Sequence, residues 1–144
     1  MKEEEKIEQK INWRFRWLGM LFSFSHIEYL KGLWLEQKYP NEIGFYSEDM
    51  CKYFDDLSID DNYQFQLTEG LVTEEEIEVI KSFHTALDNY HEGEKTDSEI
   101  LKDPNWQKIV NEGNQAWEKL KTVINNPEEL NHMLGMEKHY LQKK

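Results

Sequence analysis

The stretch WRFRWLGMLFSFSHIEYLKGLWL, residues 13–35, decides the fold, because fourteen of its side chains are large and apolar and none is proline. At 3.6 residues per turn these side chains cover most of the circumference of a helix, so that helix needs packing partners on several sides. We expect residues 3 to about 38 to form one long central helix or two helices in series. A bend is expected at Gly19 or at Ser23-Phe24-Ser25. The end is expected at Tyr39-Pro40-Asn41, because proline pushes the preceding residue out of the α region.

The same stretch is too polar to span a membrane. A span needs roughly 18 or more consecutive apolar residues, and this run is interrupted by Arg14, Arg16, His26, Glu28 and Lys31. The first six residues contain three Glu and two Lys, a net acidic start where a signal peptide would be basic. The single Cys51 fits a reducing compartment. We therefore predict a cytoplasmic protein that does not contact the membrane.

The net charge of −12 is concentrated in the middle of the chain. Residues 1–40 and 104–144 each carry a net charge of +1, whereas residues 41–103 carry −14. Such a negative field repels phosphate backbones, so we expect no nucleic-acid partner. The same field attracts a basic protein.

Residues 41–72 are expected to form an ordered acidic segment. Ser47 is a candidate N-cap for a short amphipathic helix that ends near Ser58. The alternating residues 59–71 fit an extended segment, but no second strand of similar quality is available for pairing, so we predict a loop.

The remaining helices have clear start signals. Thr73-Glu74-Glu75-Glu76 is a capping box that opens a helix ending before Gly93. Asp103-Pro104 and Asn126-Pro127 each place an acceptor at the N-cap and proline at the first helical position. Residues 98–102 are expected to form one helical turn.

Together these elements predict an all-α fold, with residues 1–144 forming a single domain. Apolar stripes on helices of this length are typical of an antiparallel helical bundle. We expect the 13–35 helix to pack against the 73–91 and 104–125 helices, and the last helix to close one side.

No catalytic motif occurs at a specific spacing, so we predict neither catalytic residues nor a cofactor. The strongest alternative is a helical enzyme or metal-binding protein that uses His84, Asp88 and His91, which share one face of a helix. Neither Glu-x-x-His nor His-Glu-x-x-His is present. We therefore favour histidines on a solvated surface, with no metal site.

Acidic and aromatic side chains gather in the middle segment. The simplest interpretation is a solvated acidic surface. The more specific interpretation is a protein-binding face, with tyrosine anchors surrounded by carboxylates that steer a basic partner. The residues of this predicted face are Tyr53, Asp55, Asp56, Asp60, Asp61, Tyr63, Glu74 and Glu75.

A small acidic helical chain with clustered Asp, Glu and Tyr on a short helix and loop resembles the immunity proteins that neutralise bacterial nuclease toxins. The resemblance covers the size, the composition and residues 47–78. It implies an inhibitor that binds and masks a cognate toxin and has no catalytic activity of its own.

Overall fold

The computed structural model describes residues 2–59 and 61–141, and within these residues the fold is all-α, as predicted. Short π-helical and 3-10 turns also occur, η1 (Lys52–Asp56) and η2 (Asp61–Tyr63). The α-helices are α1 (Glu3–Phe24), α2 (Ile27–Trp34), α3 (Tyr46–Cys51), α4 (Gln64–Thr68), α5 (Glu74–Asp88), α6 (Asp97–Lys102), α7 (Pro104–Val123) and α8 (Pro127–Leu141). None of the helices in the described part of the chain is both long enough and apolar enough to cross a membrane.

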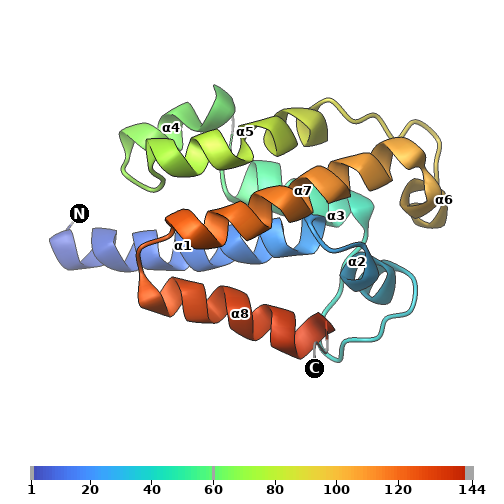
Figure 1. Ribbon diagram of the computed structural model, residues 1–144, viewed down its shortest axis with the longest axis horizontal. Coiled ribbons are helices and arrows are strands. Elements are labelled where there is room, and N and C mark those ends of the chain that lie inside the picture. The colour runs from blue at the N-terminus through green and yellow to red at the C-terminus, as the bar shows by residue number, and fades with distance from the viewer. Residues whose placement is uncertain (1, 60, 142–144) are drawn as a thin grey trace.

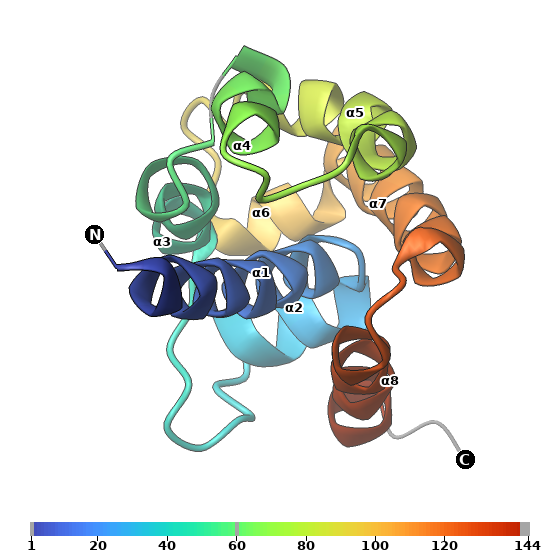
Figure 2. The same ribbon diagram turned by 90° about the vertical axis from the view of Figure 1, so that its left-hand side faces the viewer.

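Helices α5, α7 and α8 alternate in direction, whereas α1 runs the same way as α5 and α8, so the predicted antiparallel arrangement holds for α7 against the other long helices (Figure 1). Helix α7 runs back along α5, and α8 then returns along the molecule (Figure 1). Helix α1 passes through the middle, with α3, α4 and α5 on one side and α2 and α8 on the other (Figures 1 and 2). The acidic middle segment therefore forms most of one side of the fold.

The aromatic stretch splits into two helices at one of the predicted bends. Helix α1 ends at Phe24 and α2 begins at Ile27. The carbonyl of Phe22 accepts a hydrogen bond from Ser25 Oγ at 3.0 Å and lies 2.9 Å from His26 Nδ1. These side chains satisfy a carbonyl at the end of α1, and this arrangement stabilises the break.

Helix α2 ends at Trp34, earlier than the predicted end at Tyr39-Pro40. The chain turns at Gln37, which has a positive φ of 49°, and the amide of Lys38 donates to the carbonyl of Gly32 at 2.9 Å. The ring of Tyr39 then packs directly on Gly32, where an added Cβ would lie 3.0 Å from the ring. Proline is therefore not the residue that stops this helix.

The segment 41–72 contains more helix than the alternating pattern indicated. Helix α3 begins at Tyr46, with Phe45 instead of Ser47 at the N-cap position, and α4 occupies part of the predicted loop. Between them, Asn62 and Tyr63 adopt left-handed conformations with φ values of 55° and 70°. The buried amide of Gln66 donates to the carbonyl of Ser58 at 2.6 Å, which folds α4 back onto the end of η1.

The predicted starts of α5, α7 and α8 are confirmed. Thr73 and Glu76 form the reciprocal capping box of α5, and Asp103 caps α7 ahead of Pro104. The Asn126 side chain accepts from the amide of Glu128 at 2.9 Å at the start of α8. Helix α6 has a second capping box, Thr96 with Glu99, and begins slightly before the expected position.

A close approach between helices in the core is made by Gly113 of α7. An added Cβ there would lie 2.9 and 3.0 Å from the ring of Phe83 on α5, and 3.2 Å from the carbonyl of Phe24. Glycine is required at this position because α5, α7 and the end of α1 meet there.

We predict opposite effects for two glycine substitutions within helices. Gly113→Ala should lower the free energy of unfolding by about 1–3 kcal/mol through overpacking. Gly135→Ala in α8, where an added Cβ meets no atom within 4 Å, should raise the free energy of unfolding by about 0.5–1 kcal/mol through helix propensity. Urea unfolding of both variants checks the prediction, and a stabilising Gly113→Ala would contradict this packing of α5 on α7.

Candidate functional site

Tyr53 and Tyr63, predicted as the anchors of a binding face, are buried, with exposed fractions of 0% and 1%. Their hydroxyls form a hydrogen bond with each other. Trp17 Nε1 donates to the Tyr63 hydroxyl at 2.9 Å, and the Tyr53 hydroxyl lies 3.0 Å from His84 Nδ1. The prediction that these tyrosines contact a partner is therefore wrong, because both rings and both hydroxyls are used inside the core.

One direction of donation satisfies this buried row of polar groups. Trp17 donates to Tyr63, Tyr63 to Tyr53, and Tyr53 to a neutral His84 that carries its proton on Nε2. Burial raises the pKa of both tyrosines. Burial also lowers the pKa of His84 below its ordinary value of 6.5, although the charge of Asp88 acts in the opposite direction. The row is therefore uncharged at neutral pH, and the indole of Trp17, both tyrosine hydroxyls and His84 Nδ1 each have a partner.

The alternative metal site is not formed. His84 is buried and its Nδ1 faces Tyr53, whereas Asp88 is exposed at the last residue of α5 and His91 lies beyond the helix. Within residues 2–59 and 61–141, no three His, Cys, Asp or Glu side chains come together in a way that could hold a metal ion. The alternative in which these three residues share a metal is therefore not supported, and the favoured expectation of solvated surface histidines is wrong for His84, which is buried.

The exposed side of α3 and η1 retains part of the predicted face. Asp55 and Asp56 are exposed there, and Glu48, also exposed, lies on the same side two turns earlier. Glu74 and Glu75 are exposed in the first turn of α5, where negative charge stabilises the helix. Asp60 and the side chain of Asp61 lie outside the described part of the structure.

Two apolar residues that the sequence pattern did not indicate are exposed just before α3, the helix that carries Glu48. Ile43 is 77% exposed and Phe45, at the N-cap of α3, is 42% exposed. Lys52 Nζ lies 3.4 Å from the carbonyl of Ile43 and 4.0 Å from Glu48, so it links this loop to α3. We call Ile43, Phe45, Glu48, Asp55 and Asp56 the acidic α3 face.

Other carboxylates point inward and are not available to a partner. Asp49 accepts from Trp34 Nε1 at 2.7 Å, and Glu137 accepts from Trp117 Nε1 at 2.7 Å. Glu42 accepts from the hydroxyls of Tyr29 at 3.0 Å and Tyr140 at 2.8 Å. The acidic composition is therefore partly structural.

A buried ion cluster joins α1, α5 and α8. Arg14 donates to Glu76 at 2.6 and 2.9 Å, to Glu129 at 2.7 and 2.9 Å, and to the carbonyl of Leu71 at 2.8 Å. All three charged side chains are buried. Burial disfavours the charged guanidinium, but hydrogen bonds and attraction from both carboxylates outweigh this effect and raise the pKa of Arg14. Arg14 therefore remains charged in the folded protein.

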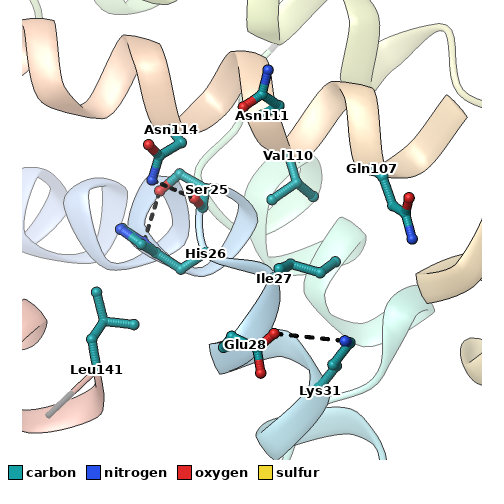
Figure 3. A pocket seen from close by; sticks show the side chains of 10 residues that line it. All are labelled: Ser25, His26, Ile27, Glu28, Lys31, Gln107, Val110, Asn111, Asn114 and Leu141. Carbon is teal, nitrogen blue, oxygen red and sulfur yellow. Dashed lines mark hydrogen bonds and ion pairs between the residues drawn. The ribbon is translucent and has the colours of Figure 1, made fainter. Parts of the chain in front are cut away.

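A surface pocket of about 450 Å³ lies where α1 breaks into α2, opposite one face of α7 (Figure 3). Ser25, Ile27 and Lys31 line one side of the pocket, and α7 contributes Gln107, Val110, Asn111 and Asn114. Leu141 lies at the α8 end. None of the residues of the acidic α3 face lines this pocket, so the described residues offer two separate candidate sites.

No family model, curated protein or solved structure matches this chain.

We predict that Arg14 stabilises the fold far more than its exposed neighbour Arg16. Arg14→Met should lower the free energy of unfolding by about 3–5 kcal/mol, because two buried carboxylates lose their partner. Arg16→Met removes the same charge from an exposed site of the same helix and should change stability by less than about 0.5 kcal/mol. Equal losses for the two variants in chemical denaturation would disprove the role given to the cluster.

The buried His84 should make stability depend on pH. The pKa of His84 is lower in the folded protein than in the unfolded chain. The free energy of unfolding is therefore highest above pH 6.5. It decreases as the pH drops below 6.5, because the unfolded chain takes up a proton before the folded protein does. The decline ends once the folded imidazole is protonated too. His84→Gln should remove this part of the decline. Unfolding of both proteins between pH 8 and pH 5 is the measurement, and identical pH profiles would contradict a buried neutral imidazole.

Proposed function

We propose that this chain is a protein-binding module that masks a basic partner protein, and that the acidic α3 face is its contact surface. The observation that carries the proposal is the presence of exposed apolar side chains among exposed carboxylates on the negative side of the fold. Ile43 and Phe45 are the apolar members, and Glu48, Asp55 and Asp56 are the acidic ones.

The charge distribution supports a basic partner. Residues 41–103 carry a net charge of −14, and the rest of the chain carries +2, which gives −12 for the whole chain. Helices α3, α4 and α5 of this segment lie together on one side of α1 (Figures 1 and 2). Although Asp49 and Glu76 are buried, exposed carboxylates occur on η1 and at the start of α5. A concentrated field of one sign speeds encounter with an oppositely charged protein and disfavours partners of like charge.

The apolar residues supply the short-range part of binding. Strong contacts usually come from a few aromatic or aliphatic anchors surrounded by polar side chains that exclude water. Phe45 and Ile43 take this role, because Tyr53 and Tyr63 are buried. Phe45 precedes α3 directly, so its backbone is held by a regular element, which limits the entropy lost on binding.

The likeness to immunity proteins suggests the kind of partner. An acidic inhibitor without catalytic groups suits a basic nuclease toxin, whose nucleic-acid site is itself positively charged. As a toxin-neutralising protein, the chain would act in the cytoplasm, and its single cysteine fits that reducing compartment.

The test compares two variants of equal net charge. Glu48→Gln/Asp55→Asn/Asp56→Asn neutralises the acidic α3 face, and Glu8→Gln/Glu118→Gln/Glu128→Gln neutralises three exposed carboxylates elsewhere. A basic partner, captured from the source organism or produced from a neighbouring gene, should associate with the first variant about tenfold or more slowly at low salt, since steering acts on the association rate. The second variant should associate nearly as fast as the wild type.

Phe45→Ala should act on dissociation instead. Loss of a central aromatic anchor should speed dissociation about tenfold or more, whereas Leu134→Ala, which removes an exposed side chain from α8, should leave the rate unchanged. Association and dissociation are measured by biosensor at several salt concentrations. A basic partner that binds both triple variants equally would exclude this face, and a specific partner that is acidic would exclude the proposed function.

A further inference from the structure

The pocket beside the α1–α2 break is lined by the side-chain amides of one helix face. Gln107, Asn111 and Asn114 follow one another at spacings of four and three residues along α7, so they share a face. Across from them are Ile27 and the ion pair between Glu28 and Lys31, whose charged atoms are 3.6 Å apart (Figure 3). The charges on the α2 side cancel.

Two of these amides are oriented by the fold. Gln107 Nε2 donates to the carbonyl of Leu101 at 3.0 Å, and Asn114 Nδ2 donates to the carbonyl of Ser25 at 3.1 Å. Because each nitrogen is held by a carbonyl, the direction of each amide oxygen is fixed as well. Neither oxygen accepts a hydrogen bond from the described residues, and the Asn111 amide makes none with them. The α7 side of the pocket therefore offers two oriented acceptors and one adaptable amide.

The apolar surface between the amides suits a flat molecule. Ile27, Val110 and Leu141 line the pocket together with the amides, and its volume of about 450 Å³ is in the range that holds small organic ligands. A charged ligand would gain little from the cancelled pair of Glu28 and Lys31. A ligand with N–H donors would satisfy the amide oxygens of α7.

We propose that this pocket is a binding site for a small, uncharged, planar molecule that carries an amide-type edge, the chemistry of a carboxamide or a nucleobase. The molecule donates an N–H group to the amide oxygen of Gln107 or of Asn114, which lie about two turns apart on α7. Asn111 supplies the complementary donor and acceptor. The site is separate from the acidic α3 face, so either proposal can fail without the other.

The test uses two probes of the same shape. Benzamide carries an N–H₂ donor, and acetophenone replaces that group with a methyl. Two-dimensional NMR of the ¹⁵N-labelled protein should show benzamide shifting signals of α7 and of the first turn of α2, with a dissociation constant on the order of 1 mM, as is usual for a ligand of this size. Acetophenone should bind at least about tenfold more weakly, because it leaves the oriented acceptors without donors.

Substitutions then locate the site. Asn111→Leu keeps the side-chain size at an exposed position and should weaken benzamide about tenfold and acetophenone less, because acetophenone has only the carbonyl to lose a partner. Gln115→Leu, on the same helix but outside the pocket, is the control and should bind like the wild type. Equal affinity for the two probes, shifts centred elsewhere, or no saturable binding of benzamide would each overturn the proposal. The comparison of benzamide with acetophenone needs only the wild-type protein, so it tests the proposal even if a variant fails to fold.

Discussion

The ion cluster around Arg14 is the contact on which the arrangement of the long helices depends. One guanidinium holds carboxylates from α5 and α8 and also a carbonyl of the loop before α5. Glu76 has a second role, because its Oε1 also accepts from the amide of Thr73 in the capping box. The start of α5 and the position of α1 are therefore set by the same carboxylate. A cluster of this kind contributes specificity more than net stability, because apolar side chains of the same size would avoid the desolvation of three charges.

Many of the acidic residues act as acceptors for aromatic donors. The indoles of Trp34 and Trp117 donate to Asp49 and Glu137, and tyrosine hydroxyls donate to Glu42, Glu92 and Asp103. An aromatic-rich core brings many N–H and O–H groups with it, and most of them need a partner when buried. The composition of the chain thus reflects two demands. Some carboxylates are required by the core, and the exposed ones on α3 and η1 belong to the proposed contact surface.

The sequence predicted the helix starts well, because a capping box or an Asp-Pro pair is a local signal that acts within four residues. It also predicted the break near Ser25, since hydroxyls that bond to the preceding turn are a local cause as well. The burial of Tyr53, Tyr63 and His84 depends on contacts between residues 10 to 46 positions apart, and no periodicity contains that information. Tyrosine beside aspartate therefore suggested a surface, whereas the structure places the ring inside and the carboxylate outside. Ile43 and Phe45 were missed for the opposite reason, because isolated apolar residues in a polar loop ordinarily indicate burial.

The π-helical turn η1 allows α3 and the residues after it to serve both the core and the surface. Tyr53 and Leu57 are four residues apart and both buried, while Asp55 and Asp56 between them are exposed. Such turns commonly arise from one extra residue within an α-helix. Removing one residue from Lys52–Asp56 would rotate everything after it by about 100° relative to α3, so that Leu57 would leave the core. The packing of the core therefore constrains the length of η1, whereas it does not constrain which side chains occupy the exposed positions Asp55 and Asp56.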